Sequence, residues 1–446
     1  VNSKIIIMAP VIKNKKGEFC HMIKAAVIFV IAVLGFAGWQ AMSDREHDPN
    51  NLLIVEVNSS AERTGLLRAQ LDRFEEDNPG IRVDVISLSW GQAFEKLSMM
   101  IAGGQYPDVI EMPDFWLSRY VSAGQIADMT PYLEQTEFDD DLEANTFSYG
   151  SIRGRVYTVP YGYYLRAMLY NKKIFARAGI EKPPLTMDDF YEDAAKISAL
   201  PGIYGYCHHG GRGGAVFYYW IMTTMNGSNR FFDNEGKSTF YQPGAAKGLT
   251  LIRDIYKNGY APKDSLNWGL NETVSGFYSG TCAMLHQTPD ALTSLRKRMD
   301  DDDYGSAPMP LGPGGNSFPH LGYIGWSVLE GSSNKAAAFK LVRHLLSREN
   351  NRAWAERSGL VPIYKGLSEN IFDADGIGAG WLQTTKDPHY QYMINPNYLP
   401  DIAEFDSIEV VQSGQAMMLG EQTPEETARA WADFMTAAEK RWEAAE

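Results

Sequence analysis

The stretch VYTVPYGYYLRAMLYNKKIFARAGIEKPPLT, from Val156 to Thr186, decides the fold of this chain. An apolar run rich in strand-forming residues, Val156 to Tyr170, passes directly into a short basic helix predicted over Lys172–Ala178. Gly179 then stands where a helix ends, and two consecutive prolines prevent its continuation. Thr186, followed closely by two aspartates, gives the next helix a capped, acidic start. The pattern predicts a strand that leaves one folded unit and delivers the chain into another.

The residues before this stretch predict a parallel α/β unit. A β-type run over Leu52–Val57 is followed by a helix that reaches Asp77, and Ile81–Leu88 alternates as a second strand. Another helix over Phe94–Ile101 leads into a third strand that ends at Asp114. Ligands bind beyond the carboxyl ends of strands in open α/β sheets. We therefore expect one edge of this unit to carry Asn58, Ser59, Trp90, Glu111 and Asp114.

The residues after the stretch repeat the alternation of helices and strands. Later predicted elements are a helix over Met187–Leu200, a strand over Tyr204–Tyr206, a return crossing over His320–Leu329, a helix over Asn334–Leu346, and a C-terminal helix capped by Thr423. No repeat of 20 to 50 residues and no low-complexity tract occurs.

Length and charge narrow the class of protein. At 446 residues and 44% hydrophobic, the chain is too long for one core and suits two domains. The formal net charge of −14 argues against nucleic acid or anionic lipid as a partner. These properties fit a soluble exported protein.

The N-terminus is typical of a targeting segment. Met22–Lys24 is a short basic start, Ala25–Leu34 is apolar, and Gly35–Ala37 is a candidate cleavage site. The apolar run is shorter than the roughly 20 residues of a membrane span, yet an uncleaved anchor stays possible. Cys20 precedes the apolar run, so the chain is not expected to be a lipoprotein. Residues 1–49 are therefore interpreted as an export signal or anchor with a linker, and the location as the periplasm or the outer face of the cytoplasmic membrane.

Several motifs resemble one family. The pattern P-Y…L-x-Y-N-K…F…A-G-I…P-P-x-T runs through 160–186, and GGQYPDVI over 103–110 resembles the family's G-x-x-P-D-V turn. FYSGTCAM over 277–284 is similar to F-x-x-G-x-x-A-M, and YGSAPMPLGPGG over 304–315 to P-x-P-x-G-P-G-G. Their order, from Leu52 to the C-terminus, resembles the family 1 extracellular solute-binding proteins, the group of maltose-binding protein.

The resemblance implies a fold, a function and partners. The fold is a type II-like periplasmic-binding-protein fold, with two discontinuous α/β lobes joined by hinge strands. One lobe would comprise 50–165 with 326–375, and the other 166–325 with 376–446. The implied function is capture of a carbohydrate, an oligosaccharide by preference, in the cleft between the lobes. Delivery to the membrane permease subunits of an ATP-binding cassette (ABC) importer would follow, with the protein acting as a monomer without a cofactor.

Aromatic side chains at predicted strand ends and in loops are candidates for stacking on sugar rings. They make up 12% of the chain, and the candidates are Trp90, Trp116, Tyr163, Tyr164, Trp220, Trp268, Tyr323 and Trp326. Each of them could instead be an ordinary core residue. Among polar candidates, Asp114 is also a plausible helix cap, Glu111 is weaker, and Gln287 lies in the turn after the A-M motif. That turn departs from the family pattern, because Asp290 stands near the place of an expected stacking Trp.

A glycine-rich loop and two cysteines leave alternatives open. The loop around Arg212 could be an anion nest or a loop at the cleft rim, and it lacks the ending of a P-loop. Adjacent His208 and His209 lack a third ligand at metal spacing. Cys207 and Cys282 could form a disulfide in an oxidising compartment, but two buried free thiols are the favoured interpretation.

No motif for catalysis occurs in a supporting context. Binding without reaction is therefore the main hypothesis. Within the same class, a polyol-phosphate-binding protein is favoured if Arg212 and Arg166 face the cleft. From other classes, an exported carbohydrate-active enzyme and a membrane-tethered sensory binding module remain open.

Overall fold

The computed structural model describes residues 50–445, except 58, 135–140, 144, 368–371 and 373–375. The expected export segment and the candidate ligand residue Asn58 lie outside the described residues. In chain order the main elements are β1 (Asn51–Glu56), α2 (Ala61–Asp77), β2 (Arg82–Ser87), α3 (Trp90–Ala102), β3 (Val109–Pro113), α4 (Asp114–Ser122), α5 (Thr130–Glu134), α6 (Thr146–Tyr149), β4 (Ser151–Ile152), β5 (Arg155–Val156), β6 (Val159–Leu165), β7 (Ala167–Asn171), α7 (Lys172–Arg177), α8 (Met187–Ser198), β8 (Tyr204–Tyr206), α9 (Ala215–Asn226), α10 (Pro243–Lys257), α11 (Leu270–Tyr278), β9 (Cys282–Gln287), α12 (Leu292–Leu295), β10 (Tyr304–Ala307), β11 (Leu321–Val328), α13 (Lys335–Leu345), α14 (Arg348–Ser358), α16 (Ala379–Lys386), α17 (Ile402–Glu404), α18 (Val410–Leu419) and α19 (Pro424–Ala444).

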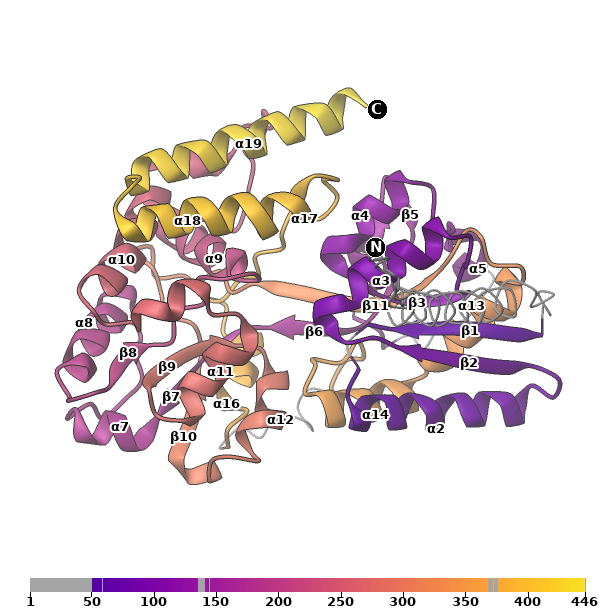
Figure 1. The fold of residues 1–446 in the computed structure, drawn as a ribbon, viewed down its shortest axis with the longest axis horizontal. Helices are drawn as coiled ribbons and strands as arrows, with labels where there is room; N and C mark the ends of the chain where they lie inside the picture. The colour runs from indigo at the N-terminus through magenta and orange to yellow at the C-terminus, as the bar shows by residue number, and fades with distance from the viewer. Residues whose placement is uncertain are drawn as a thin grey trace, which may run out of the picture. The chain divides into compact units, whose positions relative to one another are not determined.

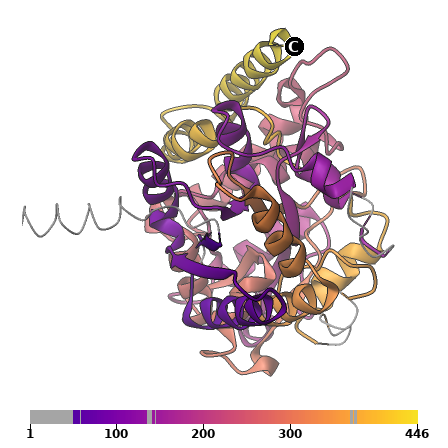
Figure 2. The ribbon, with the colours of Figure 1, turned by 90° about the vertical axis from the view of Figure 1, so that its right-hand side faces the viewer.

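Two sheets organise the part of the chain from Leu52 onward. The five-stranded sheet has the order β2-β1-β3-β11-β6, with β1 and β3 parallel and β11 antiparallel to both of its neighbours. The four-stranded sheet has the order β10-β7-β9-β8. We call the five-stranded sheet with its helices the first lobe, and the four-stranded sheet with its helices the second lobe. Figures 1 and 2 show helices on both sides of the five-stranded sheet.

The predicted crossing is confirmed. Strand β6 pairs with β11 in the first lobe, and β7 pairs with β9 and β10 in the second. Only Arg166 lies between β6 and β7, so the chain changes sheets within one residue. Figure 1 shows β6 and β11 running between the two halves of the ribbon. The predicted helix after the crossing forms as α7, and Thr186 caps α8 in a complete capping box with Asp189.

Two clusters of buried apolar side chains stabilise the lobes. One fills the first lobe and continues across the hinge, where it includes Ala167 and Leu169 on one face of β7. The other includes Met168 on the opposite face and lies under α8, α9, α10 and α19. The alternation along β7 follows from the period of two in a strand, and it gives each face of the second sheet its own core.

The favoured interpretation of two free thiols is wrong. Cys207, which directly follows β8, forms a disulfide with Cys282 at the start of β9, and the two Cα atoms lie 5.4 Å apart. Strands β8 and β9 are parallel neighbours, so the sheet itself brings the two cysteines together. Their spacing of 75 residues along the chain carries no such information. In the described part of the chain, no helix is long and apolar enough to cross a membrane.

Candidate ligand-binding site

The hinge residue Arg166 lies among polar side chains that come from several elements. Its side chain is half-buried, and Nη1 donates a hydrogen bond to Oε1 of Gln287 at 3.0 Å. Gln287 ends β9, and the same oxygen also accepts hydrogen bonds from the backbone amide and the hydroxyl of Thr288. Burial lowers the pKa of the guanidinium, while the nearby carboxylates of Asp290 and Asp114 raise it. A cation with acidic neighbours therefore stands where the chain crosses between the lobes.

Asp114 brings a carboxylate from the first lobe to the same place. It is the first residue of α4 and follows β3 directly, so it lies beyond the carboxyl end of that strand. Oδ1 accepts a hydrogen bond from the amide of Phe115, and Oδ2 accepts one from Nδ2 of Asn397, each at 2.9 Å. Burial raises the pKa of Asp114 to about 7. Asn397 belongs to the segment between α16 and α17, so this bond joins segments 283 residues apart in sequence.

His320 completes the group from the residue just before β11. A Cβ atom added at Gly322 would lie 2.8 Å from Cε1 of His320 and 3.3 Å from Oδ2 of Asp114. Both side chains thus lie close to the Gly322 backbone, and a side chain at position 322 would press on the His320 ring. Burial, together with the charge of Arg166, lowers the pKa of His320 to about 3, so its imidazole is neutral at physiological pH. We call Asp114, Arg166, Gln287, His320 and Asn397 the hinge cluster.

Part of the hydrogen-bonding capacity of the hinge cluster is unused. Among the described residues, the buried atoms Nε of Arg166, Nδ1 of His320 and Oδ1 of Asn397 have no hydrogen-bond partner. The same holds for Oδ1 of Asn395, two residues before Asn397. Each such group costs roughly 1–3 kcal/mol relative to a satisfied one. These unpaired donors and acceptors lie at the crossing, just before β11 and between α16 and α17, and Asp114 of the first lobe lies beside them.

An open aromatic face lies on α3 beside the start of α4. Trp90, the first residue of α3, keeps 40% of its surface exposed although it is a large apolar side chain. Its ring stacks on Trp116, with centroids 6.0 Å apart, and meets the edge of Phe115 at 5.8 Å. The exposed ring therefore packs on the first turn of α4, the helix that begins with Asp114. Trp116 itself is buried beneath Trp90.

Glu111 lies in a buried network that joins three elements of the first lobe. Its carboxylate accepts hydrogen bonds from the amide of Val57 at 2.7 Å, from Nη2 of Arg63 at 2.5 Å, and from the hydroxyl of Tyr161. The Arg63 guanidinium also stacks on the ring of Trp354, 4.8 Å from its centroid. The network ties the residue after β1 to α2, β3 and β6. Glu111 therefore holds the loop that contains Ser59, and it is fully buried.

The other predicted aromatic residues differ in exposure. Trp326 is fully buried and stacks on Tyr161, and Trp220 is buried with Nε1 donating to Ser317. Tyr163 and Tyr323 are also buried, and both ring systems contact Tyr149. In this structure these four side chains fill the core around the hinge. Tyr164 and Trp268 are half-buried, and both pack against the larger apolar cluster.

The glycine-rich loop is tied to the second lobe. The amides of Gly210 and Gly211 donate to the carbonyls of Ser265 and Trp268, at 3.0 and 2.9 Å. These two amides are therefore engaged and do not form an anion nest. The Arg212 side chain is exposed, while its carbonyl contacts Nε2 of His209 at 2.9 Å. No group of His, Cys, Asp or Glu able to hold a metal ion occurs among the residues that the structure describes.

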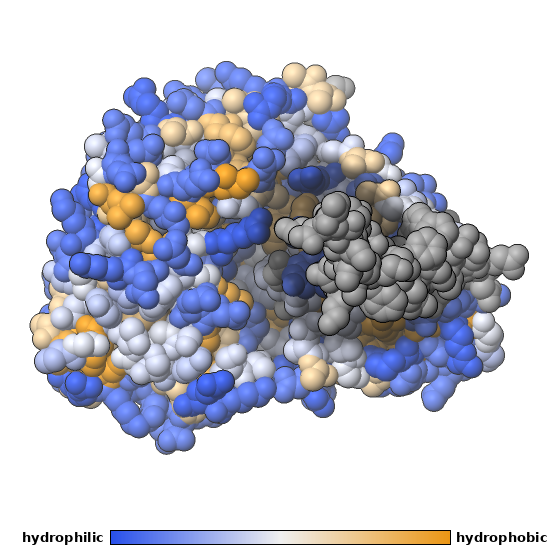
Figure 3. All heavy atoms as spheres, in the orientation of Figure 1, coloured by the Kyte–Doolittle hydropathy of each residue, from blue (hydrophilic) through white to orange (hydrophobic). Residues whose placement is uncertain are grey.

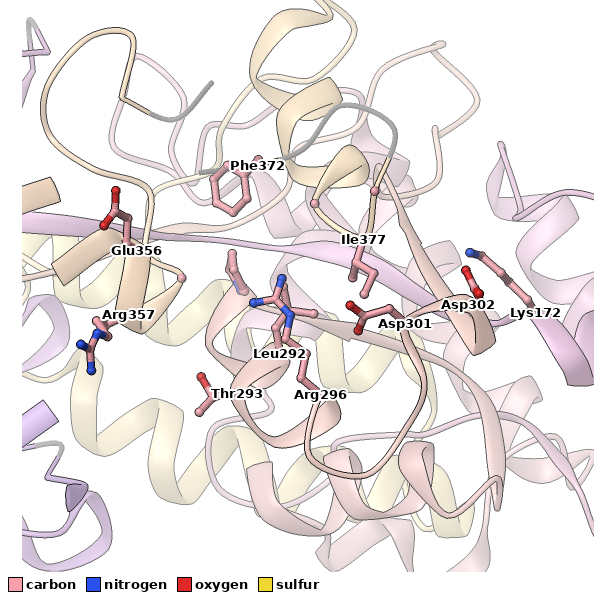
Figure 4. Close-up of a pocket in the computed structure, with 14 residues that line it drawn as sticks. Lys172, Leu292, Thr293, Arg296, Asp301, Asp302, Glu356, Arg357, Phe372 and Ile377 are labelled. Carbon is pink, nitrogen blue, oxygen red and sulfur yellow. The ribbon is translucent and has the colours of Figure 1, made fainter. Parts of the chain in front are cut away.

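A separate cavity of about 290 Å³ is lined by residues of α12, α14 and the segment 376–378 (Figure 4). Its wall includes Pro289, which stands between Thr288 and Asp290, and Gly359 after α14. Figure 4 shows Arg296 and Asp301 directed toward each other, with Lys172 beside Asp302. Basic and acidic side chains thus share the lining. The face of the molecule shown in Figure 3 is mostly hydrophilic, with apolar residues in small patches.

The arrangement defines the class of the protein. Two α/β lobes joined by hinge strands, with a cluster of buried polar side chains from both lobes at the hinge, form a two-lobe ligand-binding protein. The chain belongs to the bacterial extracellular solute-binding protein family, whose model matches residues 59–352. This membership confirms the resemblance found in the sequence motifs.

Individual relatives and a solved structure agree with the family. The chain is 26% identical to a binding protein of Brucella abortus (strain 2308), over 66% of this chain and 71% of that one. It is 24% identical to the sn-glycerol-3-phosphate-binding periplasmic protein of Yersinia pestis, over 66% and 69%. It is 23% identical to the galactooligosaccharide-binding protein of Bacillus subtilis (strain 168), over 80% and 83%. The GacH receptor of Streptomyces glaucescens superposes with a TM-score of 0.75 at 20% identity, covering 87% of this chain and 98% of the receptor. The fold is thus the predicted two-lobe periplasmic-binding-protein fold.

Sequence reasoning missed two members of the hinge cluster, His320 and Asn397. Asn397 lies between α16 and α17 in a segment without any recognisable motif. His320 lies inside the predicted return crossing, and the signal available there was an ionisable residue followed closely by two glycines. Arg166 was named only for the phosphate alternative, although a lone arginine within an apolar strand pattern is unusual.

Proposed function

We propose that this protein captures an uncharged carbohydrate or polyol at the hinge cluster and delivers it to the membrane subunits of an ABC importer. One observation carries the proposal: buried donors and acceptors on Arg166, His320 and Asn397 lack partners among the described residues and lie beside Asp114 of the first lobe. Sugar hydroxyls both donate and accept, so they can satisfy all three. The exposed ring of Trp90 supplies a flat apolar face for the C–H surface of a sugar.

Ligand binding in this geometry favours closure of the lobes. A ligand that bonds to Asp114 from the first lobe and to Asn397 from the second interacts fully only when both are close. The closed form therefore binds more tightly than the open form, and the ligand shifts the population toward it. Micromolar affinity needs about −8 kcal/mol, which stacking and several satisfied polar groups can supply.

The charges around Arg166 support an uncharged ligand. The carboxylates of Asp290 and Asp114 act on the guanidinium. The nearby histidines are neutral, because burial and the charge of Arg166 lower the pKa of His209 to about 4 and the pKa of His286 well below its ordinary value. A phosphate dianion would compete with these carboxylates. The similarity to a galactooligosaccharide-binding protein supports an oligosaccharide.

A polyol phosphate is the second candidate. The similarity to a glycerol-phosphate-binding protein and the position of Arg166 at the hinge favour it. Arg212, the other cation that this alternative needs, is exposed on the glycine-rich loop. Membership in a family of binding proteins supports binding without catalysis, and it supports export. The signal peptide and the sensory alternative both depend on residues 1–49, which lie outside the described residues.

We propose lobe boundaries close to those expected from the resemblance. Residues 50–165 with 321–375 form the first lobe, and 166–320 with 376–446 form the second. The boundary at 320/321 replaces the expected one at 325/326 because β11 pairs along its whole length within the five-stranded sheet.

A thermal-shift screen of the purified protein tests the proposed function. Mono- and oligosaccharides, polyols and glycerol phosphates would each be added. A ligand at a hundredfold excess over its Kd stabilises the folded protein by about 2.7 kcal/mol and so raises its Tm. We expect a shift with one sugar or polyol class that is lost in Asn397→Ala and Trp90→Ala. Tyr106→Ala is the matched control, because Tyr106 is an exposed aromatic residue before the opposite end of β3. A shift with phosphates alone would refute the uncharged ligand.

A further inference from the structure

The end of the last helix, α19, contacts the hairpin formed by β4 and β5. The guanidinium of Arg153 lies over the ring of Trp442, 4.3 Å from its centroid. Nη2 of Arg153 donates to the carbonyl of Trp442 at 3.1 Å, and Nη1 donates to the carbonyl of Ala445 at 3.0 Å. Both carbonyls lie at the C-terminal end of the helix, where the regular backbone pairing stops and the amide of Ala445 donates to the carbonyl of Trp442 at 3.3 Å. A cation at this end also interacts favourably with the helix dipole.

The backbone of Arg153 indicates that this side chain is needed at its position. Arg153 and Gly154 form the two-residue turn of the hairpin, with φ of +51° and +73°. Among the described residues, Arg153 is the only non-glycine residue with positive φ. A residue with a Cβ atom is strained in this region, and glycine or asparagine is the usual choice there. An arginine at this site is best explained by what its side chain contacts.

The contact joins the two lobes. The hairpin belongs to the first lobe, since the amide of Met129 donates to the carbonyl of Val156, and Val156 lies in the first apolar cluster. Helix α19 belongs to the second lobe, where Trp431 and Met435 lie in the second cluster. The half-buried ring of Trp442 packs against both clusters. Figure 1 shows α19 above α18, with its C-terminal end directed toward the first lobe.

A short path leads from this contact to the hinge cluster. The ring of Tyr398 lies 5.6 Å from that of Trp442, and its hydroxyl donates to Oε2 of Glu439 on α19 at 2.6 Å. The carbonyl of Tyr398 accepts a hydrogen bond from the hydroxyl of Ser118 on α4. Its neighbour Asn397 donates to Asp114 at the start of the same helix. The segment that carries Asn397 is therefore held between α19 and α4.

We propose that Arg153 is a positioning residue that holds α19 against the first lobe and thereby stabilises the closed arrangement in which Asn397 reaches Asp114. We call the contact between Arg153 and Trp442 the latch. The latch makes no contact with the ligand site itself, so it acts through Tyr398 and the closure equilibrium. Its effect on ligand affinity rests on the proposed function, whereas its effect on closure does not. A latch that populates the closed form before binding raises apparent affinity, because less of the binding energy is spent on closure.

The test compares four proteins: the native chain, Arg153→Gly, Arg153→Lys and Arg155→Ala. Glycine suits the positive φ of position 153, so Arg153→Gly removes the side chain without straining the hairpin. Lysine keeps the charge but lacks the planar fork that reaches two carbonyls. Arg155 is the matched control, because it lies in the same hairpin and contacts Asp128 of the first lobe at 3.7 Å.

The first measurement needs no ligand. Spin labels at Glu76→Cys on α2 and Lys247→Cys on α10, with Cys20→Ser, report the distance between the lobes by pulsed electron resonance. We expect the short-distance population to fall in Arg153→Gly, to be intermediate in Arg153→Lys, and to equal the native value in Arg155→Ala. Identical distributions in the native protein and in Arg153→Gly would overturn the proposal.

The second measurement is the affinity for whichever sugar or polyol the screen identifies. We expect Kd to rise about fivefold in Arg153→Gly, the size of a surface cation–π contact with its hydrogen bonds, and to stay unchanged in Arg155→Ala. An unchanged Kd in Arg153→Gly would also overturn the proposal. If no carbohydrate or polyol binds any of the four proteins, the proposed function fails, while the distance measurement still decides the latch.

Discussion

Replacing both Cys207 and Cys282 by alanine should lower the free energy of unfolding by about 4 kcal/mol. The disulfide closes a loop of 75 residues, and loop-closure entropy for that length corresponds to about 4 kcal/mol at 25 °C. The bond joins the end of β8 to the start of β9, the strand that ends at Gln287 in the hinge cluster. Without it, the two strands remain neighbours only through their pairing and packing.

The loss can be measured by thermal and denaturant unfolding. An unfolding entropy of about 2.1 cal/mol/K per residue over roughly 400 folded residues converts 4 kcal/mol into a fall in Tm of about 5 °C. Unfolding in guanidinium chloride, followed by tryptophan fluorescence, should show a lower midpoint for the double variant. Cys20→Ser is the matched control, since Cys20 lies far from both partners in sequence and should not affect the midpoint.

Titration of thiols in the denatured, unreduced protein tests the premise separately. If Cys207 and Cys282 are paired, only Cys20 can react before reduction. Reduction should then release two more thiols per chain. Three reactive thiols before reduction would refute the disulfide. A double alanine variant within about 1 kcal/mol of the native protein would refute the loop-entropy argument even if the bond exists.

Three further predictions concern single residues. Burial raises the pKa of Asp114 from 3.8 to about 7, so the stability that its neutral form contributes is present below pH 4 and is lost as the pH rises through 7. In urea unfolding between pH 4 and 8, the free energy of unfolding should therefore fall by at most about 1.4 kcal/mol per pH unit, and Asp114→Asn should remove this pH dependence. Glu111→Gln should destabilise the protein by about 3 kcal/mol in thermal unfolding, because Arg63 loses a buried ion pair. The double variant with Arg63→Met and Glu111→Gln should lose less stability than Glu111→Gln alone. Equal stability of the native and Glu111→Gln proteins would contradict the network. Trp90→Ala should weaken sugar binding about tenfold in calorimetry with little loss of stability, whereas an unchanged affinity would exclude Trp90 from the site.

The sequence by itself determined where the elements lie and where the chain changes lobes. Apolar alternation, the cap at Thr186 and the glycine at 179 are local signals, and the crossing strands β6 and β7 and the helices α7 and α8 formed as predicted from them. Periodicity and capping depend on residues within one or two turns, so a sequence carries them directly. The order of the motifs along the chain also indicated the family.

The sequence did not determine which of the candidate side chains reach the hinge. Trp220 and Trp326 are buried, whereas Trp90 keeps an open face, and nothing in their neighbouring residues distinguishes these cases. The sequence shows that an aromatic residue stands at a strand end, but it does not show which other element covers the side chain. Exposure is set by elements that arrive later in the chain, so only the tertiary structure decides it.

The disulfide and the hinge cluster were likewise decided by tertiary structure. Cys207 meets Cys282 because β8 lies beside β9, and Asn397 meets Asp114 although 283 residues separate them. Such pairs depend on the register of strands and on the docking of whole lobes, which are long-range properties of the packed core. The sequence therefore determined the local architecture and the class of protein, and the packing of distant segments determined the chemistry of the site.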